Sequence, residues 1–188
     1  MVEKFDFQPL LISAVQRASG QSRAFRLMFV CTGNICRSPL AHAVFAAAVH
    51  SRGLDDLFEI ESCGTQGYHV GDNADSRMRA CAQRHGVNLN HAARKWAPAD
   101  LAYYDLILAL DKGHLEFLQN QDREHLASGR ILLYRDFDPG PGRGTDVPDP
   151  YYGDQKAFEL VWQIVSSCSV ALLATLISAM ESAAIAKY

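Results

Sequence analysis

The chain has 188 residues, of which 48% are hydrophobic and 21% are charged, and its formal net charge is −3. These values are typical of a soluble protein with one well-covered core, and the weakly acidic balance argues against a nucleic-acid partner. The five cysteines are odd in number, widely spaced and without a CxxC pair, which argues against a secreted disulfide framework and against a structural metal. We therefore expect free thiols and a cytoplasmic location.

The two ends of the chain differ in character. Residues 1–25 contain acidic residues and only a short apolar run, so they do not match a secretory signal, and we expect an N-terminal extension with a helix over residues 9–18. Residues 26–188 are expected to form a single domain. The apolar run from Ile164 to Met180 is interrupted by serine and threonine and lacks flanking basic anchors, which favours a buried helix over membrane insertion.

The first expected elements enclose a short loop. Residues 26–31 (RLMFVC) form a compact apolar run that predicts a buried strand, and Thr32-Gly33-Asn34 follows it directly. Ser38 is a good helix cap and Pro39 is tolerated in a first turn, so a helix should start here and end at Gly53.

The rest of the chain continues the alternation of strands and helices. Strands are expected at residues 57–63, 106–110 and 130–134, and helices at 74–85, 112–119, near 122–128 and from the Asp154 cap onward. Residues 158, 161, 165, 168, 172 and 176 form the apolar stripe of the last helix. This alternation predicts an α/β fold with a parallel sheet covered on both sides, and a ligand site beyond the carboxyl ends of the strands.

The stretch from Cys31 to Ser38 (CTGNICRS) separates a cysteine and an arginine by five residues, between a strand and a helix. A loop of this size can turn its backbone N–H groups toward one anion, and the following helix points its positive end there. A cysteine at this place would be a thiolate at neutral pH, and Arg37 can grip two phosphoryl oxygens. Gly33 and Asn34 tolerate the left-handed turns that such a loop needs. The pattern predicts a phosphate-binding loop with Cys31 as nucleophile; its other members are Thr32, Gly33, Asn34, Ile35, Cys36 and Ser38.

Hydrolysis of a phosphate ester also needs a proton donor for the oxygen that leaves phosphorus. We expect this donor in the long loop over residues 138–153, which is rich in glycine and proline. Asp149 lies between two prolines, and Pro150 biases it toward an extended backbone. By itself an Asp-Pro pair is more often an ordinary turn, but beside the cysteine loop the general acid becomes the favoured interpretation. Tyr151 and Tyr152 are placed to line a cleft and stack on an aromatic leaving group.

Taken together, these segments resemble the low-molecular-weight protein tyrosine phosphatases. The matching pieces are VCTGNICRSP (residues 30–39), GYHVGDNADSRM (67–78), HAAR (91–94), DLILALD (105–111) and DPYYG (149–153), in family order. The resemblance extends over residues 26–188 and implies one phosphatase domain. It implies a flavodoxin-like three-layer sandwich with a four-stranded parallel sheet in the order 2-1-3-4 and helices on both faces.

The resemblance also implies a mechanism and its supporting residues. Cys31 would attack phosphorus to form a phosphocysteine, Asp149 would serve first as acid and then as base, and Arg37 would hold the phosphoryl oxygens. Ser38 would hydrogen-bond the sulfur, as well as or instead of capping the helix. Asn34 would hold the loop in shape, with Ser62 and His91 as its partners. No metal and no organic cofactor are implied.

Substrate choice would lie in the walls of the cleft. Tyr68 stands where the family often has an aromatic residue, and Tyr151 lies opposite on the acid loop, so a deep cleft would favour phosphotyrosine over phosphoserine. Related protein arginine phosphatases resemble CTGN-Thr-C at this loop, and Ile35 therefore favours phosphotyrosine. The implied partner is a phosphotyrosine-bearing protein, a tyrosine kinase among the candidates, and the chain itself would be a monomer or a weak homodimer.

Two questions stay open at this point. Cys36 either forms a reversible, redox-sensitive disulfide with Cys31, as the resemblance implies, or simply packs under the loop. The same scaffold also serves arsenate reductases, which need two further relay cysteines; Cys81 is a candidate for one, but no second cysteine lies near it. A non-catalytic phosphotyrosine-binding module is disfavoured because Cys31, Arg37 and Asp149 are all present.

Overall fold

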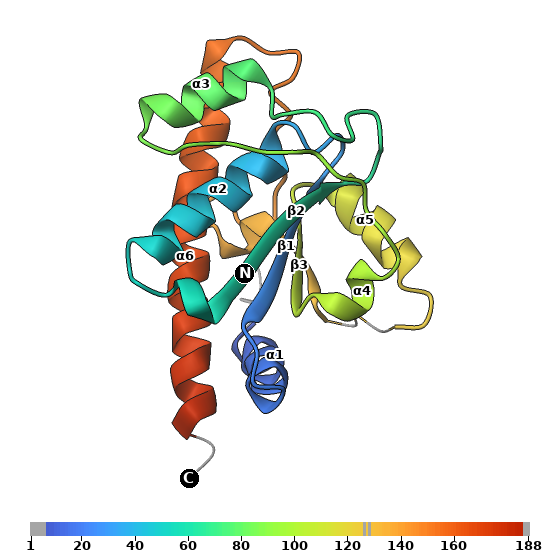
Figure 1. Ribbon diagram of the computed structural model, residues 1–188, viewed down its shortest axis with the longest axis vertical. Coiled ribbons are helices and arrows are strands. Elements are labelled where there is room, and N and C mark those ends of the chain that lie inside the picture. Colours follow the sequence, from blue (N-terminus) through green and yellow to red (C-terminus); the bar gives the residue numbers. More distant parts are fainter. Residues whose placement is uncertain (1–6, 126, 128, 186–188) are drawn as a thin grey trace.

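Four parallel strands form the centre of the molecule in a computed structural model, which describes residues 7–125, 127 and 129–185 (Figure 1). The strands are β1 (Phe25–Cys31), β2 (Phe58–Gly64), β3 (Leu106–Ala109) and β4 (Ile131–Leu133). They are hydrogen-bonded in the order β2-β1-β3-β4, with β1 parallel to both β2 and β3. The predicted parallel sheet and its 2-1-3-4 order are therefore confirmed.

Six α-helices and two short 3₁₀ helices connect and cover the described strands. They are α1 (Gln8–Gly20), α2 (Arg37–His50), η1 (Asp55–Leu57), α3 (Ser76–Arg84), α4 (Asp100–Tyr103), α5 (Lys112–Gln121), η2 (Tyr134–Phe137) and α6 (Gln155–Ile185). The helix expected near residues 122–128 is wrong for Asp122–His125, where the carboxylate of Asp122 accepts the Ala127 N–H at 3.0 Å and holds the chain in turns. Residues 126 and 128 lie outside the described part.

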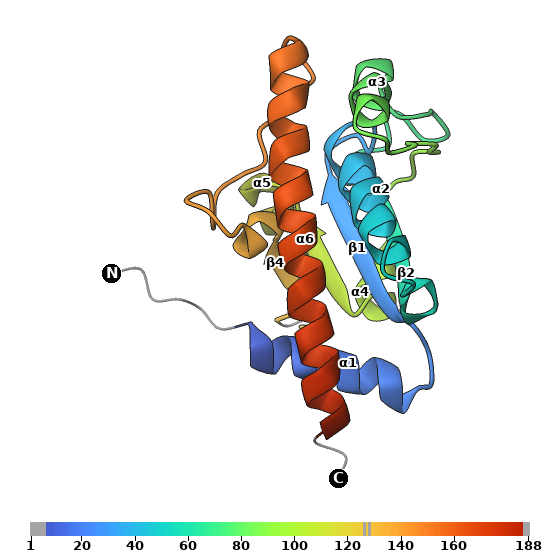
Figure 2. The same ribbon diagram turned by 90° about the vertical axis from the view of Figure 1, so that its left-hand side faces the viewer.

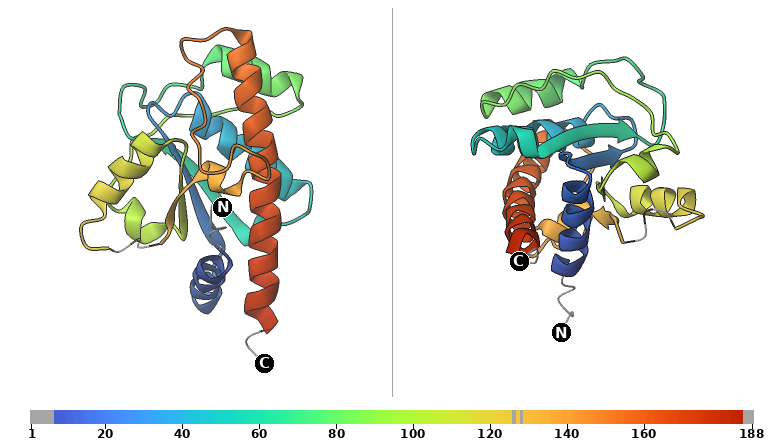
Figure 3. Two further views of the ribbon diagram at one scale, coloured as in Figure 1. Left: turned by 180° about the vertical axis from the view of Figure 1, so that it is seen from behind. Right: turned by 60° about the horizontal axis from the view of Figure 1, so that its bottom comes forward.

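Alternating side chains of β1 build two cores, one on each face of the sheet. Leu27 and Phe29 belong to the core shared with α1, α2, α3 and α6, whereas Met28 and Val30 belong to the core under α4 and α5. Period-two alternation produces this division because successive side chains of a strand point to opposite faces. The result is the expected three-layer arrangement, with helices on both sides of the sheet (Figure 3).

The last helix, α6, is 31 residues long and, by length and composition, apolar enough to cross a membrane, with a window of mean hydropathy 2.0. It is in contact with α1, α2 and α3 (Figure 2). Asp154 Oδ1 caps it by accepting the N–H groups of Lys156 and Ala157. All members of the predicted apolar stripe are buried: Phe158, Val161, Val165, Cys168, Leu172 and Leu176. Packing of this stripe into the core accounts for part of the apolar character of the helix, because 39% of its most apolar window is buried.

Helix α1 lies at the amino-terminal end of the sheet, opposite the carboxyl ends of the strands (Figure 1). Its buried residues are Leu11, Ala14, Val15 and Ala18, and it packs on α6. Just after α1, Arg23 forms a two-pronged ion pair with the buried Asp105, at 2.6 and 2.9 Å. The segment before β1 is thus packed against the core, while its separation from the domain over residues 26–188 stays a prediction.

The carboxyl ends of β1, β2 and β3 bring three loops to one edge. Cys31 pairs with Gly64 in register, and Ala109 pairs with Val30. A Cβ atom on Gly64 would lie 2.6 Å from the Thr32 carbonyl oxygen, so this position accepts only glycine without movement of the backbone. The close approach lets the loops after β1 and β2 meet beside Cys31.

Candidate active site

The cysteine loop (residues 31–38) is organised around the side chain of Asn34, which is completely buried. Asn34 has φ of 56°, a left-handed conformation that asparagine tolerates better than most residues. Its amide nitrogen donates to Ser38 Oγ at 2.8 Å and to Ser62 Oγ at 2.9 Å. Its side-chain oxygen lies 3.1 Å from His91 Nε2 and accepts the Arg94 N–H at 2.9 Å. The structure therefore brings Ser62 and His91 to Asn34, the loop residue with which the family resemblance paired them.

Cys31 lies at the base of this loop and is 3% exposed. Its sulfur accepts the Asn34 backbone N–H at 3.3 Å and lies 3.0 Å from Ser38 Oγ. Ser38 Oγ accepts a hydrogen bond from the Asn34 amide, and its own hydrogen has two acceptors within reach, the sulfur at 3.0 Å and the more distant Cys63 carbonyl oxygen at 3.4 Å. A hydroxyl and a backbone N–H thus converge on the sulfur.

The interpretation of Ser38 as a helix cap is wrong. Helix α2 begins at Arg37, the N-cap position is Cys36, and no side chain makes a cap hydrogen bond there. Ser38 lies inside the first turn, where its hydroxyl faces the sulfur of Cys31. The uncapped N–H groups at this helix end are left to receive an anion.

Arg37 connects the cysteine loop to the two loops that follow β3 and β4. Its side chain is 5% exposed, and its two terminal nitrogens bond to different carboxylates: one lies 2.7 Å from Asp111 Oδ2 and the other 2.8 Å from Asp149 Oδ2. A third, longer contact of 3.4 Å reaches Thr32 Oγ1. Asp149, predicted from its flanking prolines, thus stands at the mouth of the cysteine loop, 112 residues away in sequence from Arg37.

Asp111 and His114 complete a network that sequence reasoning did not find. Asp111 Oδ1 accepts the His114 backbone N–H at 2.8 Å as the cap of α5, and His114 Nε2 lies 2.8 Å from Thr32 Oγ1. Burial alone would raise the pKa of Asp111, but hydrogen bonds from His114 and the charge of Arg37 outweigh it and hold that pKa well below its usual range. Asp111 is therefore a permanent anion that fixes the Arg37 guanidinium. Its position directly after a predicted strand was the signal available in the sequence, because ligand sites lie beyond the carboxyl ends of parallel strands.

A pocket of about 370 Å³ opens above Cys31. Ile35 and Cys36 form part of its wall, as do His69 and the three tyrosines of the predicted cleft. The tyrosines stand at the rim, because Tyr151 is 38% exposed, Tyr68 77% and Tyr152 97%. His69 is a wall residue that the sequence analysis missed; the absence of a side chain on Gly33 leaves it room, since a Cβ there would lie 3.1 Å from the His69 ring.

Cys36 is buried beside the nucleophile position and is a free thiol. Burial, followed by the negative charges of Asp75 and Cys31, raises the pKa of Cys36 well above its usual value. Burial likewise raises the pKa of Cys63, at the end of β2. Neither environment favours a thiolate.

His42 and His91 lie close together behind the loop, and both are neutral at pH 7. Burial, followed by the charge of His91, lowers the pKa of His42 to about 4; burial also lowers the pKa of His91, against the hydrogen bond to Asn34. An unfolded chain takes up the His42 proton near pH 6.5, whereas the folded protein resists it down to about 4. The free energy of unfolding should therefore fall as pH falls through this window.

We expect His42→Gln to remove part of this acid sensitivity. Between neutral pH and about pH 4.5, the wild type should lose up to about 3 kcal/mol more stability than the variant. Urea unfolding of both proteins at the two pH values measures the difference. An equal loss of unfolding free energy in both proteins would show that His42 does not titrate in this way.

Comparisons with known proteins agree with this geometry. The family model described as low molecular weight phosphotyrosine protein phosphatase matches residues 26–182. A low molecular weight protein-tyrosine-phosphatase of Streptomyces coelicolor is 44% identical over 161 residues, 85% of this chain and 98% of that protein. The human low molecular weight phosphotyrosine protein phosphatase is 36% identical over 148 residues, 78% of this chain and 92% of that protein.

Similarity to solved structures leads to the same family. A crystal structure of a protein tyrosine phosphatase from Entamoeba histolytica, with Hepes in its active site, matches with a TM-score of 0.78 and 34% identity. The match covers 82% of this chain and 98% of the other. The chain therefore belongs to the low molecular weight protein tyrosine phosphatase family, whose members are phosphatase enzymes.

Proposed function

We propose that the chain hydrolyses phosphotyrosine in proteins through a phosphocysteine intermediate, with Cys31 as nucleophile, Arg37 as phosphate clamp and Asp149 as general acid and base. One observation carries this assignment. The Cys31 sulfur lies at the base of a loop that ends at a helix N-terminus, and the guanidinium of Arg37 connects that loop to Asp149 at 2.8 Å. Cys31, Arg37 and Asp149 line one pocket, and this supports the three proposed roles.

In the first step, the Cys31 thiolate forms a sulfur–phosphorus bond while the bond from phosphorus to the phenolic oxygen breaks. Asp149 gives its proton to that oxygen, which leaves as the tyrosine hydroxyl. Two equatorial phosphoryl oxygens replace Asp149 on Arg37, and loop N–H groups hold the charge. The 5% exposure of the Arg37 side chain supports this role, because its charge is screened little by solvent.

In the second step, Asp149, now a carboxylate, takes a proton from water as the water oxygen bonds to phosphorus. The phosphorus–sulfur bond breaks, and inorganic phosphate leaves with the Cys31 thiolate restored. Ser38 is placed to donate a hydrogen bond to the departing sulfur, at 3.0 Å. Asn34 supports this orientation because it donates to Ser38 Oγ, and the sulfur at 3.0 Å is a nearer acceptor for the hydroxyl hydrogen than the Cys63 carbonyl oxygen at 3.4 Å.

We attribute selectivity for phosphotyrosine to the depth at which Cys31 lies in the pocket. Cys31 is 3% exposed, while Tyr68, Tyr151 and Tyr152 rise around the mouth of the pocket. A phenyl phosphate is long enough to place its phosphorus at the sulfur while its ring stacks between tyrosines. A phosphoserine side chain is shorter, so its backbone would meet the tyrosines before its phosphorus reached Cys31.

Ile35 is the wall residue proposed to separate phosphotyrosine from phosphoarginine. It lines the pocket next to the nucleophile and presents an apolar surface that suits a phenyl ring. We expect Ile35→Thr to shift the ratio of kcat/KM values toward phosphoarginine by roughly 10-fold, because a hydroxyl can receive the guanidinium hydrogens. Kinetics with matched phosphotyrosine and phosphoarginine peptides measure the ratio. An unchanged ratio would remove Ile35 from the specificity argument.

The decisive substrate test is a panel of peptides carrying phosphotyrosine, phosphoserine or phosphoarginine, together with arsenate and a thiol reductant. The proposal expects phosphate release mainly from the phosphotyrosine peptide. Thiol-dependent reduction of arsenate without phosphatase activity would instead favour the arsenate reductase alternative, and a preference for phosphoarginine would favour the arginine phosphatase.

The partner proposed for this site is a phosphotyrosine-bearing protein, and a tyrosine kinase is one candidate. We also propose a cytoplasmic location, which the five free cysteines support because reducing conditions keep thiols from pairing. A monomer or weak homodimer remains the proposed state of the chain, and sedimentation of the purified protein over a range of concentrations tests it.

A further inference from the structure

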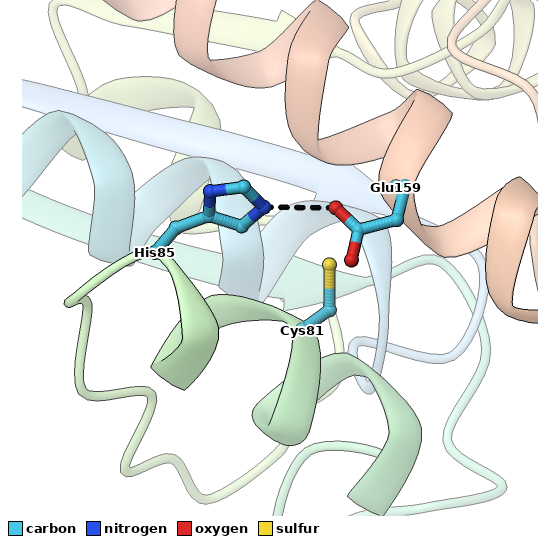
Figure 4. Close-up of side chains that lie close together, drawn as sticks. All are labelled: Cys81, His85 and Glu159. Atoms are coloured by element: carbon cyan, nitrogen blue, oxygen red, sulfur yellow. Dashed lines mark hydrogen bonds and ion pairs between the residues drawn. The ribbon is translucent and has the colours of Figure 1, made fainter.

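A second group of chemically active side chains lies away from the substrate pocket, between α3 and α6 (Figure 4). Cys81 is in the last turn of α3, His85 follows directly after that helix, and Glu159 comes from the first turns of α6. One sulfur, one nitrogen and one carboxylate oxygen of these residues all lie within 4.8 Å of one another. Cys81 is fully buried, whereas the side chains of His85 and Glu159 are 37% and 29% exposed. The group is therefore open to solvent on the histidine side.

Neighbouring side chains hold His85 and Glu159 in place. The His85 ring stacks on Trp162 with 4.3 Å between centroids and 7° between planes. The two oxygens of Glu159 have separate partners: Oε1 accepts from Arg84 Nε at 3.1 Å, and Oε2 lies 2.8 Å from His85 Nε2. Such outer contacts orient ligands in metal sites. Oε2 can exchange its histidine contact for an ion while Arg84 keeps Oε1.

We propose that Cys81, His85 and Glu159 form a binding site for a zinc-class divalent ion, separate from the active site. Thiolate, imidazole and carboxylate are the three ligand types that zinc takes in proteins, and three protein ligands leave the fourth position for water. Zinc–ligand distances of about 2.0–2.3 Å keep tetrahedral ligand atoms roughly 3.5 Å apart. The widest separation, at most 4.8 Å, must therefore close by up to about 1.3 Å, whereas His85 Nε2 and Glu159 Oε2, now 2.8 Å apart, must open by about 0.7 Å. Rotation about the side-chain torsions supplies both movements.

Binding exchanges protons for the ion. Burial, followed by the charge of Glu159, raises the pKa of Cys81, while Arg84 opposes that shift. The thiol proton is released as the sulfur–metal bond forms, and the His85 Nε2 proton is released or moves to Nδ1. The expected result is one ion bound per chain with proton release into the buffer.

An ion at this position would connect the two segments that flank the substrate pocket. At its other end α3 is capped by Asp75, whose backbone N–H donates to the Ile35 carbonyl of the cysteine loop at 2.8 Å. Helix α6 starts directly after the loop that carries Asp149. The ion would fasten α3 to α6 and raise the thermal stability of the folded chain.

Cobalt(II) is the probe for the test, because its bond to sulfur gives a charge-transfer band in the near ultraviolet. The full-length Cys31→Ser protein is the host, so that the reactive thiol of the active site does not contribute. We expect one equivalent of cobalt to produce the band, zinc to displace cobalt, and zinc to raise the Tm of the host.

Three substitutions in this host then separate the ligands. Cys81→Ser should abolish the sulfur band. His85→Phe, which keeps the stacking on Trp162, and Glu159→Gln should each weaken metal binding. We expect the loss to exceed the ~10–100-fold that follows when a residue that only orients a ligand is removed. Cys168→Ser and His50→Phe are the matched controls and should leave the titration unchanged. Circular dichroism confirms that each variant is folded.

Two outcomes would overturn the proposal. One is a host protein that gives neither a sulfur–cobalt band nor a zinc-dependent rise in Tm. The other is a band that survives in folded Cys81→Ser or is weakened equally by the matched controls. Either result would leave Glu159 with the role of an ion-pair partner of Arg84 and His85, and Cys81 with that of a buried packing residue.

Discussion

Replacing Cys31 with serine should lower kcat by at least about 10⁴-fold while leaving phosphate binding intact. The serine hydroxyl is a far weaker nucleophile than a thiolate, yet Arg37 and the N-terminal end of α2 still receive the anion. Removal of the negative sulfur also removes its repulsion of phosphate, so affinity for a phosphotyrosine peptide should be equal or higher. Steady-state kinetics and calorimetric titration with the peptide measure the two effects separately.

Cys168→Ser is the matched control for this experiment. Cys168 is a fully buried cysteine in α6 that does not line the pocket above Cys31. Its replacement should lower thermal stability while kcat stays close to that of the wild type. A folded Cys31→Ser protein that kept a readily measurable share of wild-type turnover would remove Cys31 from the role of nucleophile.

Replacing Asp149 with alanine should slow hydrolysis, and the loss should be larger for substrates whose leaving group has a higher pKa. For phenyl phosphate, whose phenolate needs a proton, we expect kcat/KM to fall about 10²- to 10⁴-fold. For an activated ester such as a nitrophenyl phosphate the loss should be much smaller, because that phenolate leaves without protonation. The slope of log kcat/KM against leaving-group pKa should therefore become steeper in the variant.

Asp146→Ala provides the comparison within the same loop. Asp146 Oδ1 accepts the Lys112 N–H at 2.9 Å and does not line the substrate pocket. Removal of the Asp146 carboxylate should change kcat/KM for all substrates by a similar, small factor. Equal losses across the leaving-group series in Asp149→Ala would argue that the carboxyl positions Arg37 and does not supply a proton.

The parts of this molecule that could be predicted from sequence are those with a local cause. Apolar runs such as residues 26–31 and 106–110 predicted strands of the sheet, because a strand that is buried on both faces is continuously apolar in sequence. The cysteine loop was found for the same reason, since Cys31, Arg37, the strand before and the helix after are contiguous. Asp149 needed the context of that loop, because an Asp-Pro pair alone is an ordinary turn.

The errors and omissions have non-local causes. The role of Ser38 depended on whether α2 begins at Arg37 or two residues later, at Pro39, a difference too fine for residue preferences. The link from Asp111 to Arg37 spans 74 residues and exists only because β3 lies beside β1. Likewise, Cys81 and His85 meet Glu159 only when α3 packs on α6. Sequence patterns describe single elements well and contacts between elements poorly.

The most direct test of the account is to trap the phosphoenzyme. Wild-type protein is mixed with a phosphotyrosine peptide, denatured within milliseconds, and digested, and mass spectrometry locates the phosphoryl group. The account predicts a phosphoryl group on the sulfur of Cys31, formed as the dephosphorylated peptide is released and lost as phosphate appears. A phosphoryl group on any other residue, or turnover that proceeds without a phosphoenzyme, would contradict it.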